Sequence, residues 1–329
     1  MFLAPDEAEL VVADAAAALA RDALPLARLH GAGGTASPDV DAELRAHVAR
    51  HGWFGLVLGD THGGSGLSPV EHALFHREIG RTCGPLDVLA QQLAVLTAGE
   101  RTLRDELLAG RHGVVLAVPD ASGLRLLGAR DATLALVVDE RGSTLLDLAG
   151  VETEQRPSLD PATAMRVLAG GAGAARSVAV STDETVWQLG QLGVAAMLVG
   201  VAEAALHLIV AYAKIRETFG RKIGTYQAVR HACADMALRA EAARCQLWSA
   251  AAALKERRGD ARVHLDAAKH LANRAAVANA DACIQLHGGI GVTDEHDAHV
   301  LLKHALLLAR LFGARRALLA RLLHAELED

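Results

Sequence analysis

The sequence Ile215-Arg216-Glu217-Thr218-Phe219-Gly220-Arg221-Lys222-Ile223-Gly224 decides the fold when it is read with Gln285-Leu286-His287-Gly288-Gly289-Ile290-Gly291, about 70 residues later. Both segments interrupt long helical patterns and combine glycines with polar groups. The guanidinium of Arg216 can donate charge-assisted hydrogen bonds to a phosphate, and glycines let backbone N–H groups approach one closely. Each segment alone is also typical of an ordinary helix end or turn. Together they predict a site for a phosphate-bearing cofactor.

The C-terminal half of the chain, around these segments, reads as a bundle of helices. Ser181-Thr182-Asp183-Glu184 has the spacing of a capping box and predicts a helix that continues to Ile215. Gly220 and Gly224 are expected to break it. Further helices with apolar stripes are predicted over 227–254, 264–287, 297–311 and 315–327. Antiparallel helices of this kind pack as a four-helix bundle.

The N-terminal part is also predicted to be helical. Pro25 ends the first alanine- and leucine-rich helix, and a glycine-rich loop follows at 31–38. Ser68 and Pro69 predict the start of a later helix, because serine caps helices and proline suits the first turn. The expected helices cover 13–24, 41–52, 68–81 and 87–108.

Between the helical parts, short apolar runs alternate with turn-forming residues, which is typical of strands. The runs are 114–118, 133–138 and 144–148. The predicted fold class is therefore α+β, mostly α. We expect an N-terminal helical domain at 1–111, a small β domain at 112–180 and a C-terminal four-helix bundle at 181–329.

The composition excludes several classes of protein. The net charge is −6 and no basic block is present, so no nucleic-acid partner is expected. Four scattered cysteines without a CxxC pair argue against a disulfide framework and a zinc site, and they fit a reducing cytoplasm. The acids Asp6, Glu7 and Glu9 are unlike the basic start of a signal peptide. We therefore expect a cytoplasmic protein.

The stretch from Leu192 to Ala213 is long and apolar enough to be considered as a membrane span. Glu203 lies near its middle, where a carboxylate costs roughly 2.5–3.5 kcal/mol on insertion scales. We therefore expect a helix buried in the bundle and no membrane partner.

The C-terminal motifs, Arg216-Glu217-Thr218-Phe219-Gly220 with Gln227 and Gln285-x-His287-Gly288-Gly289-Ile290-Gly291, resemble those of the acyl-CoA dehydrogenase family of flavoproteins. Gly52-Trp53-Phe54-Gly55-Leu56 and Gly63-Gly64-Ser65-Gly66 resemble the family less specifically. The order of helical, β and bundle domains is also that of the family. The resemblance covers most of the chain.

This resemblance implies a flavin adenine dinucleotide (FAD) that two subunits share across an interface of their C-terminal domains. One half-site would consist of Arg216, Thr218, Phe219 and Gln227. The other half-site, which faces a different flavin, would consist of Gln285, Gly288 and Gly289. Arg216 suits the pyrophosphate, and Phe219 offers an apolar face to a ring.

The family desaturates an acyl-CoA thioester: a glutamate removes the proton next to the carbonyl, and the flavin takes a hydride from the next carbon. By the resemblance, the two positions that carry this glutamate fall on Phe312 and near Gly190, which accept no proton. No catalytic residue is therefore expected here. The best alternative is Glu184, which also suits a capping role. Glu203 is a weaker one, expected to pair within the bundle.

The predicted β domain is shorter than that of the family, and the family's Thr-Glu-Pro passage is missing. A shortened middle and a missing base resemble the smaller subunit of bacterial heteromeric acyl-CoA dehydrogenases of the steroid side-chain type. The resemblance implies a heterotetramer, in which a second subunit supplies the catalytic glutamate and most of the acyl-CoA site. An electron-transfer flavoprotein is the implied electron acceptor. Two other readings stay open: a self-sufficient dehydrogenase that uses Glu184, and a flavin-free scaffold subunit.

His296 and His299, with Glu295 and Asp297 beside them, are residue types that bind metals. The chain contains no Glu-x-x-His pair, which carboxylate–histidine sites in bundles use. We therefore expect no metal and assign these histidines to a helix start.

Overall fold

The structure is a computed structural model that describes residues 4–30, 38–325 and 327. The chain forms two compact units. The bundle unit consists of Met1–Gly31, Pro69–Gly84 and Gln191–Asp329, and the sheet unit consists of Ala32–Ser68 and Pro85–Gly190. The predicted boundaries near 111 and 180 follow sequence order and stay a prediction. The glycine-rich loop predicted at 31–38 lies outside the described residues except for Pro38, which begins a helix.

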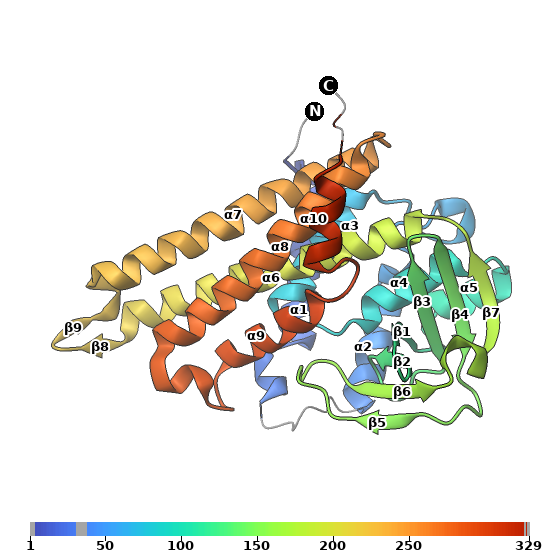
Figure 1. The fold of residues 1–329 in the computed structure, drawn as a ribbon, viewed down its shortest axis with the longest axis horizontal. Coiled ribbons are helices and arrows are strands. Elements are labelled where there is room, and N and C mark those ends of the chain that lie inside the picture. Colours follow the sequence, from blue (N-terminus) through green and yellow to red (C-terminus); the bar gives the residue numbers. More distant parts are fainter. Residues whose placement is uncertain (1–3, 31–37, 326, 328–329) are drawn as a thin grey trace. The chain divides into compact units, whose positions relative to one another are not determined.

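Long helices dominate the bundle unit, which confirms the predicted fold class. They are α6 (Thr185–Ile215), α7 (Gln227–Lys255), α8 (Ala261–His287) and α9 (Asp297–Leu308), followed by the short α10 (Arg315–Leu322). Figure 1 shows helices α7 and α8 packed side by side along their length. The observed bounds of α7, α8 and α9 differ from the predicted ones by at most three residues, whereas α10 ends at Leu322, five residues before its predicted end.

Helix α6 is the apolar helix that the sequence presented as a possible membrane span. By length and composition alone it passes that test, but 67% of its most apolar window is buried inside the protein. It contacts α3 (Pro69–Arg81) at a pair of glycines. A Cβ on Gly80 would lie 2.2 Å from the carbonyl oxygen of Met197, and one on Gly200 would lie 2.1 Å from that of Arg77. The two backbones therefore touch, as in the core of a bundle.

Helix α1 (Glu7–Ala23) begins earlier than predicted. The Asp6 side chain accepts a hydrogen bond from the backbone N–H of Glu9 at 2.8 Å, and the Glu9 side chain accepts one from the N–H of Asp6 at 2.9 Å. This reciprocal pair is a capping box. Asp6 and Glu9, two of the acids that make the N-terminus unlike a signal peptide, thus stabilise the first turn of α1.

The capping box predicted at Ser181–Glu184 is wrong. Ser181 ends strand β7, and its hydroxyl accepts a hydrogen bond from the backbone N–H of Asp183. The carboxylate of Asp183 instead accepts from the N–H of Thr185, the first residue of α6, at 2.8 Å. Glu184 is exposed directly before the helix. An aspartate within a short turn therefore starts α6.

The sheet unit contains a seven-stranded sheet in the order β5-β6-β2-β1-β3-β4-β7, with β1 parallel to β3 and the other neighbours antiparallel. Its strands are β1 (Val114–Asp120), β2 (Gly123–Leu127), β3 (Leu134–Asp139), β4 (Gly142–Asp147), β5 (Glu154–Arg156), β6 (Met165–Ala169) and β7 (Arg176–Ser181). The apolar runs predicted β1, β3 and β4. The other four strands were missed; β5, for example, is wholly exposed and has no apolar pattern.

Three helices accompany the sheet in this unit: α2 (Pro38–Arg50), α4 (Asp87–Thr97) and α5 (Arg101–Leu108). The helix predicted over 87–108 is interrupted at 98–100, where Gly99 lies. Alternate residues of the strands form the core of the unit, which includes Val115, Leu124, Leu126, Ala135, Leu146 and Leu168.

Candidate functional site

The Arg216 segment forms a tight hairpin between α6 and α7. Strand β8 (Glu217–Thr218) pairs with β9 (Arg221–Lys222), and Phe219 and Gly220 form the turn. Both turn residues have positive φ angles, 50° and 75°, as the right-handed twist of a two-residue hairpin favours. A left-handed conformation costs a non-glycine residue about 1–2 kcal/mol. The predicted break at Gly220 is confirmed, and Phe219 bears the strain.

Tyr226, directly before α7, supports this hairpin. Its hydroxyl donates a hydrogen bond to the carbonyl oxygen of Thr218 at 2.9 Å, and the guanidinium of Arg221 lies 4.1 Å from its ring centroid. The hydrogen bond with Arg221 lowers the pKa of the Tyr226 hydroxyl. Tyr226 was not predicted from the sequence, although an aromatic residue at the start of a helix beside a hairpin is a usable signal.

The hairpin of β8 and β9 lies beyond the ends of α6 and α7 (Figure 1). Phe219 is 99% exposed, the most exposed of the large apolar residues. Arg216 is exposed too, and its guanidinium makes no ion pair or hydrogen bond within the described part of the chain. Thr218 is half-buried, and Gln227 is exposed on the first turn of α7. The structure thus gathers the first predicted half-site at one end of the bundle.

The second segment forms the turn after α8. Gly288 has a φ of 67°, so its conformation favours glycine. Gly291 is needed for packing, since a Cβ there would lie 2.8 Å from the carbonyl oxygen of Ile284. Gly289 has neither reason: its φ is not left-handed, and a Cβ would meet nothing within 4 Å. The fold of this chain does not require a glycine at 289, whereas a ligand that closely approaches the backbone would.

A stack of aromatic rings connects the two segments. The ring of His287 lies 4.5 Å from that of Tyr212 on α6 and 4.4 Å from that of His296. Its Nδ1 donates a hydrogen bond to the carbonyl oxygen of Cys283 at 2.7 Å. Burial lowers the pKa of His287, which is only 5% exposed. The sequence analysis gave no role to Tyr212 or His287, because their contact spans two helices.

Two further histidines, His296 and His30, serve a helix end and an ion pair. Nδ1 of His296 accepts a hydrogen bond from the backbone N–H of Ala298 and so caps α9, as predicted for a helix start. Nε2 of His30 lies 2.7 Å from the carboxylate of Asp297. In residues 4–30 and 38–325, no three side chains of His, Cys, Asp or Glu form a group that could hold a metal ion.

The two positions to which the sequence resemblance assigns the catalytic base are Phe312 and Gly190. Phe312 is buried with a φ of 50°, and Gly190 is buried in α6. Glu203 is 6% exposed; its carboxylate accepts hydrogen bonds from Arg77 at 2.9 Å and from Arg81 at 3.0 Å. This pairing confirms the expectation for Glu203. The Glu203 carboxylate is therefore engaged in hydrogen bonds inside the bundle unit.

One acid near Phe312 was missed. A Cβ on Gly313 would lie 3.6 Å from Nε2 of Gln191, which donates to Oδ1 of Asp266 at 2.8 Å. Arg321 donates to both oxygens of Asp266, at 2.6 and 2.7 Å. Asp266 is 2% exposed. Both of its oxygens are therefore occupied within the protein, and it is a structural acid rather than a free base.

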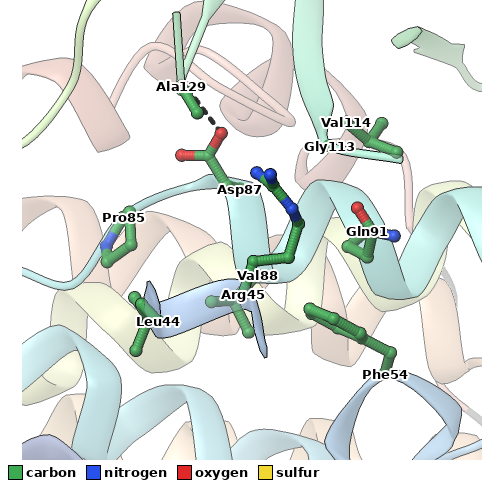
Figure 2. A pocket seen from close by; sticks show the side chains of 10 residues that line it. All are labelled: Leu44, Arg45, Phe54, Pro85, Asp87, Val88, Gln91, Gly113, Val114 and Ala129. Atoms are coloured by element: carbon green, nitrogen blue, oxygen red, sulfur yellow. Dashed lines mark hydrogen bonds between the residues drawn. The ribbon is translucent and has the colours of Figure 1, made fainter. Parts of the chain in front are cut away.

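A cavity of about 20 Å³ lies in the sheet unit. Figure 2 shows the carboxylate of Asp87 facing Ala129, whose backbone N–H donates to it at 2.6 Å. Arg45, Gln91 and Phe54 also line the cavity. Its volume suits one water molecule, so it is too small for a substrate.

A larger hollow of about 460 Å³ lies on the bundle unit, bordered among others by Leu10, Arg77, Arg244 and Trp248. Arg77 is paired with Glu203, and Arg244 is paired with Glu241. The positive charges at this surface are therefore already neutralised, and nothing favours an anion there.

Comparisons with known proteins agree with this geometry. Residues 5–110 match the model of the acyl-CoA dehydrogenase N-terminal domain, and residues 184–325 match that of the C-terminal domain. The acyl-CoA dehydrogenase FadE34 of Mycobacterium tuberculosis is 33% identical over 79% of this chain, and the match spans 38% of the length of FadE34. The acyl-CoA dehydrogenase IpdE2 of the same organism is 31% identical over 81% of each chain.

Solved structures show the same fold. A chain of the Tcur3481–Tcur3483 steroid ACAD superposes with a TM-score of 0.81, at 26% identity and over 97% of both chains. A chain of the ChsE4–ChsE5 complex from Mycobacterium tuberculosis superposes with a TM-score of 0.78, at 21% identity and over 98% of both chains. Sequence motifs, family models, relatives and fold therefore agree, and this chain belongs to the acyl-CoA dehydrogenase family.

Proposed function

We propose that this chain is a subunit of an FAD-dependent acyl-CoA dehydrogenase and completes the flavin site, while a partner chain supplies the catalytic glutamate. One contrast carries the proposal. The cofactor segment keeps a strained, exposed Phe219 beside an Arg216 that has no ion pair among the described residues, whereas both positions to which the resemblance assigns the family's base hold residues that accept no proton.

The cofactor segments have the chemistry that FAD requires. An exposed aromatic ring on a left-handed turn costs free energy in the isolated chain, and such strain clusters at sites where a ligand or a partner uses it. Arg216 would hold the pyrophosphate, with Thr218 and Gln227 beside it. Gln285, Gly288 and Gly289 would offer donors and close backbone approach to a second flavin. When bound, FAD supplies the acceptor for the hydride.

The glutamate that removes the proton would come from the partner. In this chain Glu203 is bound by arginines, Asp266 by Arg321 and Gln191, and Glu184 is an exposed residue before α6. None of these three acids has a free carboxylate at Phe312 or Gly190, the positions to which the resemblance assigns the base. The acyl-CoA would accordingly bind mainly on the partner, and this chain would be inactive alone.

The similar proteins support a particular assembly and substrate class. One similar structure is of a steroid ACAD, and another is of a complex between two named chains. We infer a heterotetramer of two unlike pairs that desaturates a steroid-derived acyl-CoA in the cytoplasm. The reduced flavin must pass its electrons on, and an electron-transfer flavoprotein is the acceptor that we infer.

An absorbance spectrum tests this proposal. The chain would be purified alone and after co-expression with a dehydrogenase encoded beside it, and each sample would be assayed with acyl-CoA and an electron acceptor. We expect flavin absorbance and turnover only when both chains are present. A lone chain that is yellow and desaturates a thioester would favour the self-sufficient enzyme with Glu184 as base. Absence of flavin from both samples would favour the scaffold.

A further inference from the structure

His287 belongs to the Gln285–Gly291 motif, yet nothing in the proposed flavin chemistry explains it. Its imidazole lies between the rings of Tyr212 and His296, at centroid distances of 4.5 and 4.4 Å. Tyr212 stands one turn before the hairpin, and its carbonyl oxygen accepts the backbone N–H of Arg216 at 2.9 Å. The ring contact between Tyr212 and His287 thus links the end of α6, just before Arg216, to the end of α8, just before Gly288.

The hydrogen bond of His287 fixes the state of its ring. The carbonyl oxygen of Cys283 can only accept, so Nδ1 of His287 carries the proton. Because burial disfavours the charged form, the ring is neutral and Nε2 carries no hydrogen. The Nδ1 bond ties the ring back to its own helix, α8, and so sets its orientation between Tyr212 and His296.

His287 contacts both ends of the turn after α8. Gly291 packs on its side chain, since a Cβ at 291 would lie 3.0 Å from the Cβ of His287. The ring of His296, at the far end of the turn, lies 4.4 Å from that of His287 at an interplanar angle of 57°, and His296 caps α9. The contact between the two imidazoles therefore joins the ends of segment 288–296.

We propose that His287 is the positioning residue that fixes the Gly288–Gly289 turn against the end of α6. It thereby holds the two flavin half-sites of this chain at one fixed spacing. This inference rests on the proposed function, since it concerns the same two segments. His287 itself touches no flavin in this scheme; it acts through the glycine turn and through Tyr212.

Two substitutions test the contribution of the His287 ring and that of its hydrogen bond separately. His287→Phe keeps an aromatic ring in the stack but loses the donor to Cys283. His287→Asn keeps an amide donor near the position of Nδ1 but loses the ring. His207→Phe, at an exposed position of α6, is the matched control. Each variant would be made in the two-chain complex, beside the wild type and Arg216→Gln.

The measurements are the FAD dissociation constant of the flavin-stripped complex and its thermal midpoint without flavin. We expect both His287 variants to bind FAD about tenfold more weakly, the effect of losing one contact worth about 1.4 kcal/mol. The midpoint without flavin should fall in both His287 variants, because each removes a ring or a hydrogen bond from a site that is 5% exposed. Measuring FAD affinity on the folded complex separates this loss of stability from the loss of binding. The double variant Tyr212→Leu/His287→Phe should lose less free energy of FAD binding than the sum of the two single variants, because both substitutions alter the same contact between the rings of Tyr212 and His287. Histidine ¹⁵N spectra of the wild type should show a protonated Nδ1 at His287.

Each outcome decides between the claims. Suppose that the wild-type complex binds FAD, that Arg216→Gln binds FAD more weakly, and that both His287 variants bind FAD as the control does. The positioning role of His287 is then wrong, and the proposed function stands. If the wild-type complex binds no FAD, both are wrong. A protonated Nε2 at His287 would also contradict the positioning role. If His287→Phe does not assemble, His287→Asn and Tyr212→Leu test the same stack.

Discussion

The Nε atom of Arg77 on α3 donates a hydrogen bond to Oε2 of Glu203 on α6 at 2.9 Å, across 126 residues of sequence. Arg81, one turn further along α3, donates to the same oxygen from Nε and from Nη2. The carboxylate is buried in the bundle unit, next to the glycine contact between the same two helices. Glu203 is therefore a structural ion-pair partner.

Glu203→Gln should destabilise the chain. It removes a charge that the guanidinium groups of Arg77 and Arg81 share, and breaking a buried pair from one side costs about 3–5 kcal/mol. Glu78 also pairs with both arginines, at 3.5 and 3.6 Å, so we expect the low end of this range. Denaturant unfolding measures the effect. Glu241→Gln, which breaks the exposed pair with Arg244, is the control and should cost about 1 kcal/mol or less. Equal losses in the two variants would refute the structural role of Glu203.

Phe219→Gly should separate stability from flavin binding. Glycine relieves the left-handed strain, worth about 1–2 kcal/mol, and partly offsets this by making the unfolded chain more flexible. We expect the thermal midpoint without flavin to stay level or rise, while FAD binding by the two-chain complex weakens. Phe219→Ala keeps the Cβ and is the matched control for strain. Phe219→Ala should weaken FAD binding equally, without the gain in stability. A loss of stability in both variants would show that the Phe219 ring already stabilises the flavin-free protein, which contradicts the proposal.

The stability of the chain should rise with pH between about 7 and 10 because of Lys269. Lys269 is fully buried on α8, and its Nζ donates to Oδ1 of Asn273 at 2.7 Å and to the carbonyl oxygen of Leu308 at 3.3 Å. Burial lowers its pKa from the ordinary 10.5 to about 7. Between these values the unfolded chain binds a proton that the folded chain does not. Each pH unit therefore adds up to about 1.4 kcal/mol to the free energy of unfolding.

Lys269→Met should remove this slope, and chemical unfolding at several pH values measures it. Lys214→Met, at an exposed position of α6, is the control and should leave the slope unchanged. Below pH 7 both states of the wild type bind the proton, and the slope should vanish. A slope that persists in Lys269→Met would assign it to other groups.

Glu184→Gln should leave turnover by the two-chain complex within about twofold of the wild type. Glu184 is exposed before α6, and a partner glutamate would remove the proton in the proposed mechanism. The measurement is kcat with a saturating acyl-CoA. Loss of a true general base costs at least about 10²-fold. A loss of that size, with flavin binding intact, would make this chain the self-sufficient enzyme.

Local sequence features predicted much of the fold. The period of apolar residues located α7 and α8, and the glycines at 220 and 288 marked real breaks, because positive φ angles are a local property. Helix starts were less accurate: α1 begins at the Asp6–Glu9 capping box and α6 begins after Asp183. Strand β5 was missed because an exposed edge strand needs no apolar pattern.

The predicted cofactor residues were identified by motif and resemblance, and the structure places them in two exposed turns. The residues that hold those turns were not predicted. Tyr226 supports the hairpin from the next helix, and His287 contacts Tyr212 across 75 residues. Asp266 meets Arg321 across 55 residues.

The sequence by itself determined which segments become most of the helices and where glycine allows the chain to turn. These properties depend on backbone preferences and side-chain chemistry within a few residues. Tertiary structure alone decided that Glu203 is neutralised by α3, that Asp266 is occupied, and that one imidazole joins the two cofactor segments. Such contacts depend on how helices pack, because packing brings together side chains whose separation in sequence carries no information about their distance in space.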